Sequence, residues 1–255
     1  MALLHIDYVP ESIKVNLPLY MILPSPGEMR GVPVSKRKVL YLLHGLSDDG
    51  SAWQRYTAIE CIAALYGLVV IMPSVSRSFY TDQPNGQLYF SYLTDELPHY
   101  LNDVFGIAPC REDTLIAGNS MGGYGAFKAA FLHPELYSAA ASFSGVLSMA
   151  FIITYPHDPR HEEFRFLFGD LEKLAGSEHD PAAWLGLAAQ NHSELPKLYI
   201  SCGRQDDLYP FNVQFHAACQ SLGIPVDYHE EDGFHDWFFW NVQIQRFLAA
   251  NLKPI

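Results

Sequence analysis

The chain has 255 residues, with 16 lysines and arginines against 28 aspartates and glutamates, which gives a formal net charge of −12 at pH 7. Hydrophobic residues make up 49% of the chain and charged residues 17%, so it can bury a large core, and wholesale disorder is excluded. The acidic balance argues against a nucleic-acid partner, because a phosphate backbone needs a basic face. No apolar run reaches the ~18 residues that span a bilayer, so we expect no membrane partner.

The first predicted elements are strands. Residues 3–8 and 15–23 alternate apolar and polar side chains, which predicts an antiparallel pair. Continuous apolar runs at 39–43 and 68–72 are typical of central strands buried on both faces. Apolar residues at helical spacing over 57–66 place a helix between these two strands.

The remaining chain continues this alternation. A helical pattern covers 88–105, and we expect Pro98 to kink or break it. The later predicted elements are strand 114–117, helix 122–132, strand 139–143, strand 197–202, helix 211–222, strand 226–229 and helix 236–252. Over 148–195 the regular pattern lapses, which indicates a small cap or lid of short helices and loops. The sequence therefore predicts a single α/β domain over 1–255, with a mostly parallel sheet and a ligand site at the carboxyl ends of its strands.

A Gly-x-Ser-x-Gly motif at 118–122 follows the strand 114–117 directly and precedes a helix. In this context the serine occupies a strained turn that exposes its hydroxyl above the sheet. We therefore expect Ser120 to be a nucleophile and the backbone N–H of Met121 to donate to an oxyanion. The loop after the strand 39–43 is the corresponding place for a second donor, the N–H of Leu46.

A serine hydroxyl needs a base to take its proton, and the base needs an acid to orient it. Among 11 histidines, His235 lies in the loop between the last predicted strand and helix, where an imidazole can reach the serine. Asp206 and Asp207 both follow the preceding strand, and the spacing does not separate them as the acid. Asp232 and Asp236 lie too near His235, and we expect a solvated turn and a helix N-cap there.

Five blocks of sequence resemble the esterase D-like branch of the α/β-hydrolases, and within it the bacterial tributyrin esterases. These blocks are Leu42 to Asp49 with Trp53; Ser78 to Asp82 followed by Asp95 to Pro98; Gly118 to Gly125; Tyr199 to Gly203 with Asp206, Leu208 and Tyr209; and Gly233 to Trp237 with Trp240. The resemblance covers almost the whole chain. It implies the α/β-hydrolase fold with helices on both faces of the sheet, Asp206 as the acid, and Leu46 and Met121 as the oxyanion donors.

The resemblance also implies a serine carboxylesterase that hydrolyses short-chain acyl esters, acetyl to butyryl, through an acyl-enzyme and without a cofactor. S-formylglutathione hydrolases of the same superfamily carry a cysteine where Ser47 stands here, which disfavours a thioester substrate without excluding it. An acyltransferase of similar fold and a non-catalytic binding module are two further readings. The intact set of Ser120, Asp206 and His235 argues against the binding module.

Three tryptophans, Trp53, Trp184 and Trp237, are our candidates for the wall of the substrate pocket. His157 and His161 have the spacing of zinc ligands on a helix, but neighbouring prolines disfavour a helix, so we expect an exposed loop and no metal. The four cysteines form no C-x-x-C pair and the start of the chain does not resemble a signal peptide, so we expect free thiols and a cytoplasmic protein. A small-molecule ester is the expected partner, and a homo-oligomer is compatible with the sequence.

Overall fold

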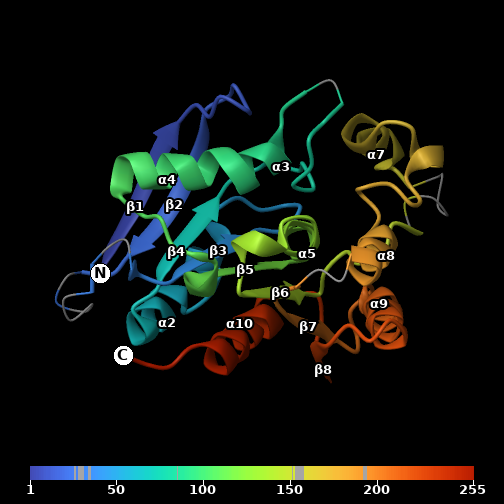
Figure 1. Ribbon diagram of the computed structural model, residues 1–255. Helices are drawn as coiled ribbons and strands as arrows, with labels where there is room; N and C mark the ends of the chain where they lie inside the picture. The colour runs from blue at the N-terminus through green and yellow to red at the C-terminus, as the bar shows by residue number, and fades with distance from the viewer. Residues whose placement is uncertain are drawn as a thin grey trace.

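The computed structural model describes residues 1–25, 27, 32–33, 36–84, 86–150, 152, 158–191 and 194–255. Within these residues, eight strands form one sheet (Figure 1). Its spatial order is β1 (Ala2–Tyr8), β2 (Leu17–Leu23), β4 (Val69–Pro73), β3 (Val39–Leu43), β5 (Thr114–Asn119), β6 (Ala139–Phe143), β7 (Lys197–Gly203) and β8 (Val226–Glu231). β2 pairs antiparallel with β1 and with β4, and the other pairs are parallel. The predicted mostly parallel sheet is therefore confirmed.

Helices cover both faces of the sheet, as the α/β-hydrolase fold requires. α2 (Ile59–Tyr66) and α10 (Trp237–Asn251) lie together on one face (Figure 1). The short α1 (Ala52–Tyr56) contacts α2 on the same face. The opposite face carries α4 (Leu97–Phe105), α5 (Met121–Leu132), α8 (Pro181–Asn191) and α9 (Tyr209–Ser221). β3 is buried along its whole length because it is covered from both sides. None of the helices in the described ranges is long and apolar enough to cross a membrane.

The helix around Pro98 does not break. α3 (Tyr89–Ser91) continues through a π-helical turn, Tyr92–Glu96, directly into α4, where Pro98 is the second residue. A proline has no N–H to donate, and its ring crowds the carbonyl four residues earlier. The wider π turn lies directly before it and accommodates both effects, so the predicted break was wrong, and the kink stays a prediction.

Between β6 and β7 the described chain forms α7 (His161–Phe168), a 3-10 turn at Leu171–Lys173 and α8. Two further 3-10 turns, Arg111–Asp113 and Pro134–Leu136, flank β5 and α5. The exposed loop predicted around His161 was wrong, because His161 begins α7; His157 lies outside the described residues. In the part of the chain that the structure describes, no group of three or more metal-binding side chains comes together.

Candidate active site

Ser120 occupies a sharp turn between β5 and α5. Its backbone has φ 53° and ψ −118°, a conformation that residues with a Cβ adopt at an energetic cost. Its N–H donates to the carbonyl of Phe143 on the neighbouring strand β6 at 2.9 Å. The sheet thus holds the serine in the strained geometry that the Gly-x-Ser-x-Gly motif predicts.

Two glycines make this turn sterically feasible. A Cβ on Gly118 would lie 2.4 Å from the carbonyl carbon of Gly122, and a Cβ on Gly122 would lie 2.4 Å from the carbonyl oxygen of Leu43. Both distances are shorter than any real contact. The absence of side chains at 118 and 122 therefore lets the start of α5 rest directly on the end of β3.

The loop after β3 places Leu46 next to the serine. Gly45 and Asp48 close a turn in which the Asp48 N–H donates to the Gly45 carbonyl at 3.2 Å. Leu46 lies inside this turn and borders the same cavity as Ser120. Met121 is the first residue of α5, and the first N–H groups of a helix have no acceptor within the helix. The two predicted oxyanion donors thus flank the serine from two separate segments.

His44 fixes the position of this loop from inside the protein. Its side chain is fully buried; its Nε2 accepts from the Val75 N–H at 3.1 Å, so Nδ1 carries the proton and donates to the Gly45 carbonyl at 2.8 Å. Burial lowers the pKa of His44 to about 4. The imidazole is therefore neutral at neutral pH, and both of its nitrogens are used to hold the backbone.

His235 follows β8, and its Nδ1 lies 2.8 Å from the Oδ2 of Asp206, which follows β7. The Asp206 side chain is fully buried, whereas the His235 side chain is 36% exposed. Burial alone would raise the pKa of Asp206, but hydrogen bonds from His235 and from the Leu208 N–H outweigh it and bring the pKa below its ordinary value. Asp206 is thus an ionised carboxylate that orients the imidazole.

The structure distinguishes Asp206 from its neighbours. Asp207 is exposed, and Asp232 forms an exposed ion pair with Arg204 at 3.4 Å. Asp236 caps α10 by accepting from the Phe239 N–H at 2.9 Å, as the sequence predicts. Of these four aspartates, Asp206 is the one that contacts the imidazole.

A cavity of about 400 Å³ joins these groups at the carboxyl ends of the strands. Ser120 and His235 both border it. The rest of its wall is nonpolar on one part and charged on another: the nonpolar residues are Leu46, Phe79, Met121, Val146, Leu208 and Phe211, and the charged residues are Asp158, Arg160, Asp206 and Asp207. A second hollow of about 680 Å³ lies on the outer side of the His235 loop, against Phe234 and Phe238, and contains neither Ser120 nor His235.

The structure places the three candidate tryptophans outside this cavity. Trp53 is fully buried beneath the sheet, where its indole N–H donates to the Leu43 carbonyl at 2.9 Å. The ring of Trp237 packs edge-to-face on Trp53, with 5.0 Å between the ring centres. Trp184 is also fully buried and packs on Tyr124 at 5.1 Å. Large aromatic side chains contribute much apolar area to a core, and these three support the elements around the site instead of lining it.

Sequence reasoning found Asp206 and Asp207 but missed the other two charged residues of the cavity, Asp158 and Arg160. Asp158 and Arg160 form a bidentate ion pair, with Oδ2 and Nη2 at 2.7 Å and Oδ1 and Nε at 2.9 Å. They lie in the irregular 148–195 segment, where no motif marks them. Val146, Leu208 and Phe211 could have been found from their positions, because each follows a strand of the sheet at its carboxyl end.

Comparisons with known proteins agree with this geometry. The family named Esterase, described as "Putative esterase", matches residues 11–250. An acetyl esterase of Caldicellulosiruptor saccharolyticus is 33% identical over 96% of both chains. Among solved structures, fluorophosphonate-binding serine hydrolase F of Staphylococcus aureus has a TM-score of 0.90 and 32% identity, covering 99% of this chain and 98% of its own. A structure titled as an S-formylglutathione hydrolase of the same organism has a TM-score of 0.87 and 32% identity, with 99% of both chains covered.

Proposed function

The chain belongs to the esterase family and is a carboxylic ester hydrolase, and from that premise we propose that Ser120, His235 and Asp206 hydrolyse esters with a short acyl chain. One observation carries the proposal. The strained, cavity-facing Ser120 and the Asp206-oriented His235 border a single cavity at the end of the sheet. A serine in such a turn and a histidine held by a buried carboxylate are the parts that acyl transfer requires.

In the proposed mechanism, the Ser120 oxygen attacks the ester carbonyl carbon while Nε2 of His235 takes the hydroxyl proton. The backbone N–H groups of Leu46 and Met121 stabilise the negative charge on the carbonyl oxygen. The carbon–oxygen bond to the alcohol then breaks, and His235 gives its proton to the departing alcohol. Water, activated by the same imidazole, attacks the acyl-enzyme and releases the carboxylic acid. Asp206 stays ionised throughout and stabilises the imidazolium.

The wall of the cavity supports a small acyl group. The nonpolar residues that surround Ser120 favour an alkyl chain, and a volume of about 400 Å³ has to hold both the acyl group and part of the alcohol. The relative named acetyl esterase points the same way. We therefore expect acyl chains of about two to four carbons to be preferred.

Hydrolysis of p-nitrophenyl esters from acetate to decanoate by the purified protein tests this proposal. Activity that is highest for the shorter chains is expected, and Ser120→Ala is expected to lower kcat by about 10⁴ or more without unfolding the protein. Circular dichroism of the variant controls for folding. A folded Ser120→Ala variant that keeps most of its activity would overturn the assignment of the nucleophile.

A second candidate, thioester hydrolysis, is favoured by the structural neighbour titled as an S-formylglutathione hydrolase. The charges in the cavity weigh against it here. Three carboxylates, Asp158, Asp206 and Asp207, face one guanidinium, Arg160, and a glutathione leaving group carries a net negative charge that they would repel.

Comparison of kcat/KM for S-formylglutathione and for p-nitrophenyl acetate decides between the two candidates. We expect the oxygen ester to be the better substrate. A value for S-formylglutathione that is a hundredfold higher would instead establish the thioesterase.

A further inference from the structure

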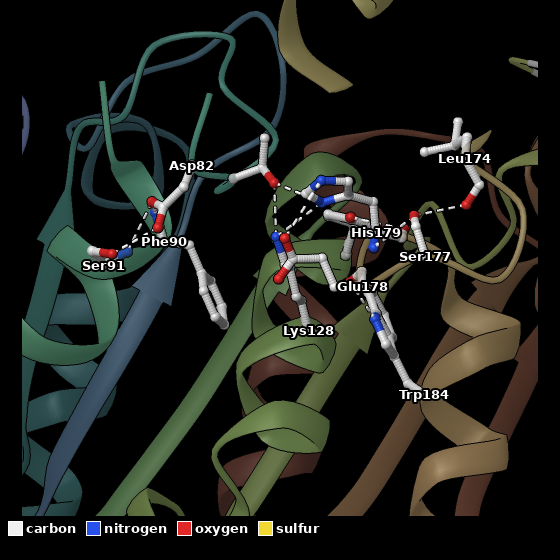
Figure 2. A network of polar contacts seen from close by, with 11 residues as sticks. Asp82, Phe90, Ser91, Lys128, Leu174, Ser177, Glu178, His179 and Trp184 are labelled. Atoms are coloured by element: carbon white, nitrogen blue, oxygen red, sulfur yellow. Dashed lines mark hydrogen bonds and ion pairs between the residues drawn. The ribbon is translucent and has the colours of Figure 1, made fainter. Parts of the chain in front are cut away.

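A lysine is buried in the helix that begins at the nucleophile. Lys128 lies on α5, eight residues after Ser120, and only 1% of it is exposed. Figure 2 shows its side chain between the segment that carries Glu178 and His179 and the start of α3, where Phe90 lies. A buried ammonium group is costly unless its surroundings compensate for its lost hydration, so each of its contacts has a consequence.

The contacts of Lys128 come from three separate segments. Its Nζ donates to the Thr81 hydroxyl at 2.7 Å, lies 3.3 Å from Nδ1 of His179 and sits 4.4 Å from the centre of the Phe90 ring. The nearby carboxylate of Asp82 instead accepts from the backbone N–H groups of Phe90 and Ser91, at 2.8 and 3.0 Å. Among the residues that the structure describes, Lys128 is thus held by a hydroxyl, an imidazole and an aromatic face rather than by a direct carboxylate partner.

Thr81 belongs to a strained segment that reaches the cavity. Three non-glycine residues that precede Thr81 have left-handed backbones: Ser76 at φ 51°, Phe79 at φ 52° and Tyr80 at φ 49°. Such conformations persist where surrounding contacts impose them. Thr81 is fully buried, and its hydrogen bond from Lys128 is one of the contacts that anchor this segment.

The strained segment contacts the two places that carry the proposed oxyanion donors, Met121 and the loop with Leu46. Phe79 borders the cavity, and its N–H lies 3.3 Å from the sulfur of Met121. The Tyr80 hydroxyl donates to the carbonyl of His44 at 3.0 Å, at the base of the loop that carries Leu46. A displacement of Thr81 would therefore move the cavity wall and loosen the support of the oxyanion loop.

His179, which lies in the segment before α8, contacts both Lys128 and Thr81. The distance from the Thr81 Oγ1 to Nδ1 of His179 is 2.9 Å, and the Tyr124 hydroxyl donates to the His179 carbonyl at 2.9 Å. Burial, followed by the charge of Lys128, lowers the pKa of His179 to about 4. The imidazole is therefore neutral and accepts at Nδ1, which allows a chain of donors from Lys128 to Thr81 to His179.

We propose that Lys128 is a positioning residue of this site, which holds Thr81 and thereby sets the place of Phe79 in the acyl pocket. This rests on the proposed function, because it assumes that the ester binds in the cavity beside Ser120. With the hydrogen bond removed, Phe79 is less constrained. Longer acyl chains then fit better, and short chains are held less well against the oxyanion donors.

The test compares p-nitrophenyl acetate with p-nitrophenyl hexanoate. In Lys128→Met and in Thr81→Val, the ratio of kcat/KM for acetate to that for hexanoate should fall about tenfold, because small misplacements at a site have effects of this order or larger. Both substitutions keep the approximate shape of the side chain. Thr81→Ser retains the hydroxyl and should keep the wild-type ratio.

The double variant Lys128→Met/Thr81→Val separates this inference from a general loss of packing. Both changes break the same hydrogen bond between Lys128 and Thr81, so the fall of the ratio in the double variant should be smaller than the product of the two single effects, whereas independent effects would multiply. Unchanged ratios in both folded single variants would overturn the inference. That outcome would leave the proposed function intact as long as Ser120→Ala is inactive, and an active Ser120→Ala would overturn the proposed function instead.

The pH dependence of the same ratio gives a second readout, and it serves also if one variant fails to fold. Burial lowers the pKa of Lys128 to about 8, although the charges of Glu178 and Asp82 raise it in part. Deprotonation weakens its hold on the Thr81 hydroxyl and the Phe90 ring. The wild-type ratio should therefore fall with a midpoint near pH 8, and the ratio of Lys128→Met should be flat there. A wild-type ratio that is constant from pH 6.5 to 9.5 would contradict the positioning role.

Discussion

Asp206 and His235 lie 29 residues apart in the chain, and one hydrogen bond of 2.8 Å joins the buried carboxylate of the first to Nδ1 of the second. This bond occupies Nδ1, so Nε2 is the ring nitrogen left to exchange a proton with the serine. Asp206→Asn keeps the shape of the side chain but removes the charge and favours the wrong tautomer of His235.

The expected loss of kcat in Asp206→Asn is about 10³ or more, measured with p-nitrophenyl acetate. Asp207→Asn is the matched control, because Asp207 is the exposed neighbour, and we expect it to change kcat less than about threefold. If Asp207→Asn proved the more damaging of the two, the acid would have to be reassigned.

The close contact between α5 and β3 predicts that a side chain at Gly122 lowers stability and activity. Gly122→Ala would place a Cβ 2.4 Å from the Leu43 carbonyl oxygen, so the helix start has to move. We expect a loss of about 2–4 kcal/mol in the free energy of unfolding in urea, together with reduced activity. Gly186→Ala serves as control, since a Cβ at that position on α8 meets nothing within 4 Å. Equal stability of the two variants would show that the contact is not tight.

The helices and strands were predictable from the sequence where a single physical requirement, such as burial on both faces, decides the residue types. β3 coincides with a continuous apolar run, because a strand covered on both faces favours nonpolar side chains along its whole length. Ser120 and His235 follow from a motif and from chain order. The course of the chain past Pro98 could not be predicted in this way, since the π turn before it breaks the 3.6-residue period.

The sequence and the family resemblance single out Ser120, Asp206 and His235, which the structure brings together at one cavity, but they did not indicate most of the residues of its wall. Trp53 looked like a pocket residue, but tertiary packing buries it under the sheet. Arg160 and Lys128 gave no signal, because a single charge in an irregular segment or in a helix is ordinarily solvated. Arg160 matters because its ion pair with Asp158 borders the cavity, and Lys128 matters because folding brings it to Thr81, which is remote in the sequence.

The buried, neutral His44 predicts that the protein loses stability at low pH. Its pKa is about 4 in the folded protein, against an ordinary value of 6.5, so the unfolded chain binds the proton more strongly. The contribution of His44 to the free energy of unfolding, about 3 kcal/mol, is fully present above pH 6.5 and is lost as the pH falls toward 4. The partly buried His179 acts in the same window.

Urea unfolding of the wild type and of His44→Gln at pH 7 and pH 4.5 isolates the share of His44. We expect the variant to lose less stability between the two pH values than the wild type. Identical losses would mean that His44 is not the buried neutral group described above.

Lys128 predicts a second rise of stability with pH, in the alkaline range. Its folded pKa of about 8 lies below the ordinary 10.5, so burial of the charged form costs stability below pH 8 and the cost disappears as the pH rises to 10.5. The full difference is about 3 kcal/mol. Lys128→Met removes it, so the variant should gain stability relative to the wild type at pH 7 and lose that advantage by pH 10. Equilibrium unfolding at both pH values measures this, and an advantage that grows with pH would contradict the buried charge.

Ser120, Ser144, Phe79 and Tyr80 all have left-handed backbones without being glycine, and all four lie in the turns around the site. Among the described residues, these four of the six non-glycine residues with a positive φ thus lie where the ester is expected to bind. A region held by its surroundings against its own preference relaxes before those surroundings melt. On heating, the enzyme should therefore lose its activity over a temperature range in which its far-ultraviolet circular dichroism is still that of the native protein, so that inactivation and unfolding are two separate events.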